Sequence, residues 1–335
     1  MPASSEASAS TVLVTGAAGF LGSHLVDALL TRGHRVIGVD DLSHGSRENL
    51  GTALANPAFT FHVLDVCRRD DLRNAARDAR AVAHLAALKI PRYGKAVETL
   101  LVNSEGCRSA LDAARELGAK FVLTSTSDVY GKNPKIPFSE TGDSMLGPST
   151  IARWAYAVSK LFDEHLALGY ADAYGVPAVI LRIFGSYGPR QNLTWWGGPQ
   201  SVFIGNILRG EPVPVHGDGR QTRSFTYVSD TVAGIVTAIE KDAANGEVFN
   251  LGSTQEISIV ELARLIKRLS GTPGELRLEF IPYEKLSGRP YEDVLRRVPD
   301  IAKARKTLGF EPIVSLEEGL RQTIEWQRAL GGGVP

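Results

Sequence analysis

The segment Val12-Leu-Val-Thr-Gly16-Ala-Ala-Gly19-Phe-Leu-Gly22 begins as an apolar strand pattern and continues as a helical pattern, with glycines at the junction. Glycine has no Cβ, so the backbone can turn tightly there, and a pyrophosphate can approach the free N–H groups of a helix N-terminus. The next strand pattern ends at Asp40-Asp41, where a carboxylate can accept hydrogen bonds from both hydroxyls of a ribose. The segment therefore predicts a dinucleotide-binding unit.

The acidic pair also bears on which dinucleotide is bound. A carboxylate there would repel a 2′-phosphate, so NAD is favoured over NADP, while Arg47 is near enough in sequence to leave NADP open. Two later strand ends extend the predicted dinucleotide site. Asp65-Val66 would meet the adenine, and the small residues of Leu85-Ala86-Ala87 would let the dinucleotide lie across the edge of the sheet. Core packing or a solvated turn explains either segment equally well. The contacts predicted around the first turn are Gly16, Gly19, Phe20, Leu21, Gly22, Asp40 and Asp41.

Strand and helix patterns alternate through the first half of the chain, which predicts an α/β fold with a Rossmann-type, doubly wound parallel sheet. Strands are predicted at 11–15, 35–40, 60–66, 81–87, 120–127 and 178–184, and helices near 20–32, 70–78, 98–117 and 152–174. After residue 185 the predicted elements are helices at 199–209, 258–270 and 315–330 and strands at 248–252 and 276–280. We expect a disordered tail at 1–10, an NAD-binding domain at 11–185 with returning segments near 225–252, and a smaller C-terminal substrate lobe within 186–330.

Composition narrows the class of partner. The 335 residues include 37 acidic and 37 basic ones, so no excess of positive charge indicates nucleic acid or an anionic membrane. No apolar run approaches the ~18–20 residues of a membrane span, and residues 1–10 do not resemble a signal peptide. Cys67 and Cys107 show no pairing or metal spacing, and neither do the 7 histidines. We expect a cytoplasmic protein with free thiols and no metal.

Tyr156 and Lys160 lie one helical turn apart in Tyr156-Ala-Val-Ser-Lys160 and so share a helix face. A phenol titrates near pH ~10, so acting as a base near neutral pH requires roughly 4 kcal/mol of stabilisation of its anion. One ammonium ~4 Å away supplies about that much at an effective dielectric constant of ~20. Thr126, at a strand end, can hydrogen-bond the same substrate hydroxyl. The alternatives are a surface pair and a strand end that makes local backbone bonds.

Several motifs together resemble the extended short-chain dehydrogenase/reductase family, specifically its NAD-dependent nucleotide-sugar epimerases and dehydratases. They are T-G-A-A-G-F-L-G at 15–22, D-D-L-S at 40–43, H-L-A-A at 84–87, S-T-S-D-V-Y-G at 125–131, Y-A-V-S-K at 156–160 and R-S-F-T-Y-V-S-D at 223–230. The resemblance implies that Tyr156 is the base, that Lys160 orients the nicotinamide ribose and lowers the tyrosine pKa, and that Thr126 is the third catalytic group. It also implies a homodimer formed through the helices at 98–117 and 152–174.

The same resemblance assigns binding residues. Arginines suit phosphate because a planar guanidinium binds it through two prongs, and Arg223 and Arg297 are expected to hold the substrate diphosphate. The further residues expected at the cofactor are Asp65, Val66, Leu85, Ala86, Ala87, Lys89, Asn103 and Thr124, and those expected at the substrate are Thr126, Ser127, Gln200 and Val202. One departure concerns Gly185, where many members have an asparagine that touches the substrate. Trp195 or Trp196 could compensate, with Gln200 near the nucleotide base, or the tryptophans could serve loop packing alone.

The resemblance leaves the reaction open. All such enzymes first form a 4-keto sugar, which is then reduced on its other face, loses carbon dioxide from C6, or loses water. Asp128 occupies a position that is typically glutamate in the dehydratases and decarboxylases and a small residue in many epimerases, and Ser127 before it argues against dehydration. The segment Ala87-Leu-Lys89 resembles the corresponding segment of UDP-galactose 4-epimerases. The segments at 153–156 and 291–299 instead resemble those of uronic acid decarboxylases.

From these residues, 4-epimerisation of a UDP-hexose or UDP-hexuronate is the favoured expectation. UDP-glucuronate decarboxylation and 4,6-dehydration are the alternatives, and Asp128, which discriminates between the reactions, is counted among the catalytic residues. A silent NAD-binding protein on the same fold is the alternative outside enzymes. The intact Thr126, Tyr156 and Lys160 argue against it.

Overall fold

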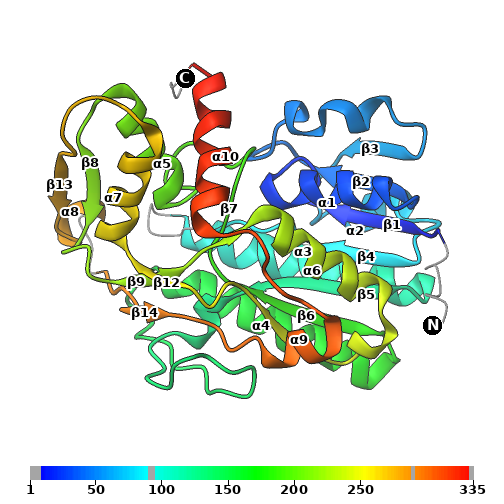
Figure 1. Cartoon of the computed structure of the whole chain (residues 1–335). Helices are drawn as coiled ribbons and strands as arrows, with labels where there is room; N and C mark the ends of the chain where they lie inside the picture. Colours follow the sequence, from blue (N-terminus) through cyan, green and yellow to red (C-terminus); the bar gives the residue numbers. More distant parts are fainter. Residues whose placement is uncertain (1–8, 90–94, 288–290, 332–335) are drawn as a thin grey trace.

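The computed structural model describes residues 9–89, 95–287 and 291–331, so most of the expected N-terminal tail lies outside the described residues. Within these ranges a seven-stranded sheet has the strand order β3-β2-β1-β4-β5-β6-β11 (Figure 1). Each neighbouring pair in it is parallel. The strands are β1 (Thr11–Thr15), β2 (Arg35–Asp40), β3 (Phe59–Val63), β4 (Ala81–His84), β5 (Lys120–Thr126), β6 (Ala178–Ile183) and β11 (Val248–Leu251).

Helices cover both faces of the sheet. Successive side chains of a strand point to opposite faces, so one strand can contribute to both hydrophobic clusters. Val12 and Val14 belong to one hydrophobic cluster, while Leu13 between them belongs to the other. Helices α1 and α6 pack together over the first face, and α2, α3 and α4 form a connected layer over the second (Figure 1). Their bounds are α1 (Phe20–Thr31), α2 (Arg69–Ala75), α3 (Ala96–Leu117), α4 (Trp154–Tyr174) and α6 (Val228–Glu240).

The strand order reverses at β1, whose neighbours are β2 on one side and β4 on the other. Thr15 at the end of β1 is in register with His84 at the end of β4. The connections that leave these two strands therefore begin side by side at the carboxyl edge of the sheet. In open parallel sheets this reversal is the place where a ligand crevice forms.

The smaller lobe is continuous with the first hydrophobic cluster, which includes Phe203, Leu262 and Leu320 together with Val12 of the sheet. Its helices are α5 (Pro199–Arg209), α7 (Ile259–Ser270), α8 (Glu284–Ser287) and α10 (Leu316–Ala329). Its small sheets pair β8 (Val213–His216) with β13 (Leu278–Ile281), and β9 (Thr222–Ser224) with β12 (Glu256–Ser258) and β14 (Arg296–Arg297). The strands β7 (Ser186–Tyr187) and β10 (Thr226–Tyr227) pair between the lobe and the large sheet.

The elements follow the sequence prediction closely, with shorter strand ends. The sequence did not predict α6, whose apolar residues are buried against α1, or α9 (Ala302–Leu308), which packs on β11 and α6. Although α9 lies in the range expected to form the substrate lobe, it therefore covers the large sheet. Within the described ranges, no helix is long and apolar enough to cross a membrane.

A buried ion pair joins the elements that carry the polar end of β5. Arg182 of β6 donates Nε to Oε1 of Glu164 on α4 at 3.0 Å and Nη2 to Oε2 at 2.7 Å. The hydroxyl of Ser125, on β5, donates to the same carboxylate. The pair fixes α4 against β5 and β6, one turn beyond Lys160.

Glu164→Gln is expected to lower the free energy of unfolding by about 3 kcal/mol, because it leaves the buried guanidinium of Arg182 without a counter-charge. Glu311→Gln is the matched control, since Glu311 pairs with Arg305 at the surface and such pairs contribute about 1 kcal/mol or less. Urea unfolding of both variants measures the difference. Equal decreases in the free energy of unfolding of the two variants would show that the buried pair stabilises the fold no more than a surface pair.

Candidate active site

The glycine turn leaves the N-terminus of α1 open. Gly16 has φ +70°, a conformation that favours glycine, and a Cβ on Gly16 would lie 2.8 Å from the backbone nitrogen of Ala86. A Cβ on Gly22 would lie 1.9 Å from the carbonyl oxygen of Gly16. Among the described residues, no side chain caps the start of α1 at Gly19. Its first N–H groups are thus available to an anion such as a pyrophosphate.

The two acidic residues at the end of β2 differ in their surroundings. Asp40 is buried, and its carboxylate accepts hydrogen bonds from the backbone N–H groups of Ala18 and Leu42, each at 2.9 Å. Burial raises the pKa of Asp40. Asp41 is exposed, so it is the better placed of the two for ribose hydroxyls, whereas Asp40 ties β2 to the glycine turn. Arg47, which left NADP open, lies over the ring of Phe61.

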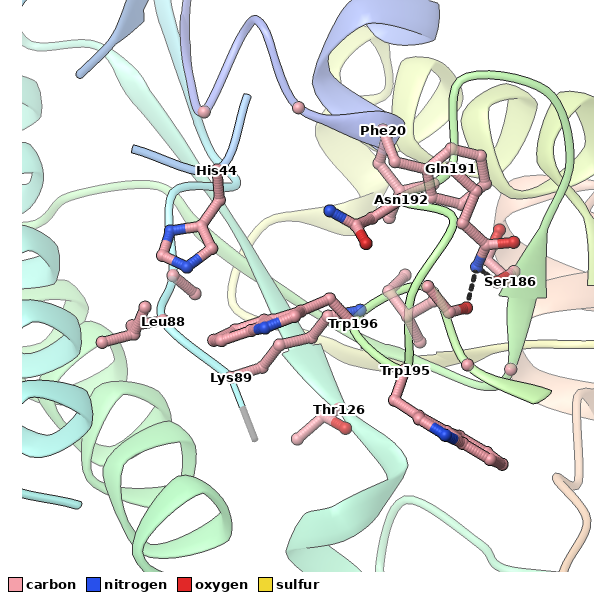
Figure 2. A pocket seen from close by; sticks show the side chains of 18 of the residues that line it. Phe20, His44, Leu88, Lys89, Thr126, Ser186, Gln191, Asn192, Trp195 and Trp196 are labelled. Atoms are coloured by element: carbon pink, nitrogen blue, oxygen red, sulfur yellow. Dashed lines mark hydrogen bonds between the residues drawn. The ribbon is translucent and has the colours of Figure 1, made fainter. Parts of the chain in front are cut away.

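A cavity of about 890 Å³ runs from this turn to the small lobe. Figure 2 shows side chains from both domains around it, with Phe20 near the glycine turn and Thr126 at the opposite end. Most of the predicted site residues line it: Gly16, Gly19, Phe20, Leu21, Gly22, Asp40, Asp41, Asp65, Val66, Leu85, Ala86, Ala87, Lys89, Thr124, Thr126, Ser127, Asp128, Tyr156, Gln200, Arg223 and Arg297. An open helix N-terminus beside an exposed carboxylate fits a dinucleotide.

Three predicted residues lie behind the wall of the cavity. Asn103 joins the segment after β4 to α4, because its amide accepts from Leu88 N at 2.7 Å and donates to Ser159 Oγ at 2.9 Å. Lys160 is almost fully buried. Val202, expected at the substrate, instead packs against the core, because α5 directs it inward.

Tyr156 and Thr126 both line the cavity, and the Thr126 hydroxyl acts to lower the pKa of the phenol. Burial, followed by the negative charge of Asp128, raises the pKa of Tyr156 well above its ordinary range. Nζ of Lys160, on the same helix, lies 3.2 Å from Oδ2 of the buried Asp163. Lys160 is thus paired with a carboxylate here, and its expected lowering of the tyrosine pKa stays a prediction. Asp163, three residues after Lys160, was the sequence signal for this pairing.

Arginines from three segments gather around two carboxylates beside this tyrosine. Oδ1 of Asp128 accepts from Arg297 at 2.6 Å and from Arg153 at 3.1 Å. Burial alone would raise the pKa of Asp128, but the charges of Arg297 and Arg153 outweigh it and lower that pKa. Arg223 pairs with Asp293 at 2.8 Å. Asp128 is consequently an ionised group at neutral pH.

The arginine cluster carries more positive than negative charge. Arg297 of β14 is in register with Arg223 of β9, and burial together with the charge of Arg297 lowers the pKa of Arg223 to about 10. Nε of Arg297 is buried and has no hydrogen-bond partner among the described residues. An anionic ligand would relieve both conditions. Sequence reasoning did not assign Arg153 or Asp293 to the site, although Arg153 stands three residues before Tyr156.

Gly185 has a structural explanation. Its φ is +37°, and a Cβ there would lie 2.3 Å from the carbonyl oxygen of Ser224. No side chain fits at this position without moving β9. The neighbouring loop supplies Trp195 and Trp196 to the cavity instead (Figure 2), and Gln200 of α5 also lines it. In the part of the chain that the structure describes, no group of three His, Cys, Asp or Glu side chains could hold a metal.

Known proteins resemble this chain in sequence and in structure. A family model described as GDP-mannose 4,6 dehydratase matches residues 13–323. The chain is 38% identical to UDP-N-acetyl-alpha-D-glucosaminuronate decarboxylase of Bacillus cytotoxicus, over 95% of this chain and 98% of that protein. It is also 38% identical to UDP-glucuronic acid decarboxylase 1 of Arabidopsis thaliana, over 93% of this chain and 68% of that protein.

Among solved structures, UDP-glucuronic acid 4-epimerase from Bacillus cereus, in complex with UDP-glucuronic acid and NAD, is similar with a TM-score of 0.85. The sequence identity is 32%, and the match covers 96% of this chain and 99% of that chain. The family model and these relatives thus carry the names of three reactions: 4,6-dehydration, decarboxylation and 4-epimerisation.

His84→Asn is expected to reduce the acid sensitivity of the fold. Burial, followed by the charge of Lys160, lowers the pKa of His84 to about 3, so below pH ~6.5 the unfolded chain binds a proton here that the folded protein does not. As the pH is lowered from ~6.5 to ~5, His84 therefore reduces the free energy of unfolding of the unsubstituted protein by roughly 2 kcal/mol. Urea unfolding at several pH values tests whether the free energy of unfolding decreases less in the variant than in the unsubstituted protein as the pH is lowered. Parallel loss in both proteins would exclude His84 as the responsible group.

Proposed function

The chain belongs to the extended short-chain dehydrogenase/reductase family of NAD-dependent nucleotide-sugar epimerases, dehydratases and decarboxylases, and we propose that it is a UDP-hexuronate decarboxylase. The observation that carries the proposal is the ionised Asp128, held by Arg153 and Arg297 next to Tyr156. The two decarboxylases that are 38% identical over most of the chain support it. The similarity to a 4-epimerase structure supports the shared first step equally well.

The proposed cofactor is NAD, held by the open N-terminus of α1, by Asp41 and by the wall from Leu85 to Ala87. When bound, NAD would supply a positively charged acceptor for hydride from C4 of the sugar and a donor for its return. Tyr156 removes the proton of the C4 hydroxyl, and Thr126 hydrogen-bonds the same group. The raised pKa of Tyr156 means that this step depends on positive charge brought into the cavity.

Loss of carbon dioxide follows from the position of the new ketone. A C6 carboxylate is β to a C4 ketone, so breaking the C5–C6 bond releases neutral carbon dioxide and leaves the bonding electrons in an enolate shared by C5 and O4. Tyr156, now a neutral phenol, and Thr126 stabilise the charge on O4. Asp128 repels the substrate carboxylate, and this repulsion disappears as carbon dioxide forms. Water then protonates C5 and leaves hydroxide, and Tyr156 returns its proton to O4 as hydride comes back to C4.

Binding of a UDP moiety is supported by two sets of groups. Arg223 and Arg297 face each other across adjacent strands and suit a diphosphate. Gln200 is buried at the cavity wall, and its Nε2 has no hydrogen-bond partner within the described ranges. That N–H can donate to a carbonyl oxygen of a pyrimidine base, which would satisfy an otherwise costly buried donor.

Epimerisation at C4 is the second candidate, favoured by one observation. Lys89 lines the cavity at the end of the segment after β4, as the resemblance to UDP-galactose 4-epimerases implies. Both reactions share the 4-keto intermediate, and they differ in whether C6 is lost before C4 is reduced.

Purified protein incubated with UDP-glucuronate, without added cofactor, is expected to release carbon dioxide and form a pentose nucleotide. UDP-N-acetylglucosaminuronate and UDP-glucose serve as parallel substrates, and chromatography with mass detection reads the products. Asp128→Asn is expected to lower the decarboxylation rate by about 100-fold, since it removes the charge that disfavours the carboxylate.

Asp128→Glu is the control for this variant, because it keeps the charge and is expected to restore part of the rate. A product of unchanged mass would replace decarboxylation with epimerisation, and a product lighter by water would indicate dehydration. Binding of NAD without turnover of any of the three substrates would favour the silent NAD-binding protein.

We also propose a homodimer formed through α3 and α4. The two helices pack against each other and expose apolar side chains: Val97 and Leu101 are 70% and 51% exposed on α3, and Val158 and Phe162 are 45% and 52% exposed on α4. Each of these pairs is four residues apart and so lies on one helix face. A second copy presenting the same face would bury them.

Phe162→Glu is expected to convert the dimer into a monomer, because it places a charge on the apolar face that the partner would bury. Light scattering after size-exclusion chromatography gives the mass. Ile313→Glu is the matched control, since Ile313 is 82% exposed elsewhere on the surface, and it is expected to leave the dimer intact. A monomeric unsubstituted protein at micromolar concentration would contradict this interface.

A further inference from the structure

Two adjacent tryptophans of the loop at residues 190–198, called here the strap, point in opposite directions (Figure 2). Trp195 stacks on His216 of β8 with ring centroids 3.8 Å apart and meets the edge of Phe203 on α5. Trp196 points across the cavity toward the cofactor side, where its ring centroid lies 4.4 Å from that of His44. The strap is thus anchored in the small lobe and reaches the dinucleotide-binding domain.

Internal hydrogen bonds hold the strap in a defined shape. Asn192 Oδ1 accepts from the backbone of Thr194 at 2.9 Å, and Thr194 Oγ1 accepts from the backbone of Trp196 at 3.3 Å. The buried Gln191 donates its amide to the carbonyl of Gly197. A Cβ on Gly197 would lie 1.9 Å from the carbonyl oxygen of Asn192, so the loop closes tightly on itself. Trp196 is therefore presented by a compact loop and not by a loose one.

The start of the strap is fixed to α1. Arg190, with φ +64°, donates Nη1 to Oδ2 of Asp27 at 2.7 Å. The carbonyl of Pro189 accepts from Nε2 of His24 at 3.0 Å. Both partners belong to the helix whose N-terminus faces the cavity, so the strap is positioned relative to the glycine turn.

The other half of the contact is also tied to the glycine turn. His44 belongs to the connection after β2, three residues beyond Asp41, and its side chain is exposed. The same connection is held down by Ser46, whose N–H donates to the carbonyl of Ala18 at 3.0 Å, and by Asn49, whose side chain donates to that carbonyl at 2.8 Å. Trp196 and His44 therefore meet across the part of the cavity that the glycine turn borders.

We propose that Trp196 and His44 form a clasp that closes over the bound dinucleotide and slows its release. The inference rests on the proposed binding of NAD. A decarboxylation that returns its hydride leaves the cofactor oxidised at the end of each cycle, so the cofactor has no need to leave between turnovers. A clasp from the substrate lobe keeps it in place while the nucleotide sugar exchanges from the side of the arginines.

Trp196→Ala is expected to raise the rate of NAD release by about fivefold or more, as loss of an aromatic pair and of its cover over the cavity implies. Release is measured by loading the protein with radiolabelled NAD, adding excess unlabelled NAD and counting the label that stays bound. His44→Ala is expected to act in the same direction. Trp196→Phe, which keeps an aromatic ring, is expected to stay within about twofold of the unsubstituted protein.

The double variant Trp196→Ala/His44→Ala separates a clasp from two independent effects. If the rings act on each other, the double variant releases NAD about as fast as the faster single variant. Multiplying effects, or a Trp196→Ala release rate equal to that of the unsubstituted protein, would overturn the clasp while leaving NAD binding intact. An unsubstituted protein that binds no NAD at all would overturn the clasp and the proposed function together.

Discussion

The reversal of strand order between β1 and β4 is the constraint on which the site depends. Because the two strands run parallel and in register, with Thr15 beside His84, their connections leave the sheet at the same edge and must then separate. Gly16 allows this, since any Cβ there would collide with the backbone of Ala86. Thr15 reinforces it, because its hydroxyl accepts from the N–H groups of both Leu85 and Ala86 at 3.2 Å. The crevice is thus a consequence of backbone geometry before any ligand is considered.

Charge divides this crevice into two ends. At the glycine turn the positive contribution comes from backbone N–H groups of α1, and the acidic side chain of Asp41 stands beside them. At the other end Arg153, Arg223 and Arg297 surround Asp128 and Asp293. A neutral or cationic ring is suited to the space between, and phosphates or a carboxylate are suited to the arginines. Burial strengthens these interactions because little water is present to screen them.

The small lobe contributes more than a second wall. Arg297 and Arg223 come from strands of the lobe, yet one of them holds Asp128 at the end of the large sheet. The strap likewise contacts three elements. Arg190 pairs with α1, Trp195 stacks on β8, and Trp196 contacts the connection after β2. The two ends of the cavity are therefore linked by side chains as well as by the shared hydrophobic core. Such links make the cavity one site assembled from both parts of the chain.

Local pattern determined most of the fold and the cofactor end of the site. Strand and helix periodicity, the glycine spacing and the four-residue step from Tyr156 to Lys160 are short-range features, so the sequence alone predicted the parallel sheet, the open helix N-terminus and the tyrosine that lines the cavity. Helix α6 was not predicted from the sequence, because the role of its apolar residues is seen only when the fold buries them against α1.

Only the tertiary structure decided how the charges pair. Asp128, Arg153 and Arg297 stand far apart in the chain, and no periodicity relates them, yet folding places two guanidinium groups on one carboxylate oxygen. The pairing of Lys160 with Asp163 and the raised pKa of Tyr156 both depend on burial, which the spacing of the residues does not reveal. The contact of Trp196 with His44 has the same origin, since two loops from different domains meet only after both have folded.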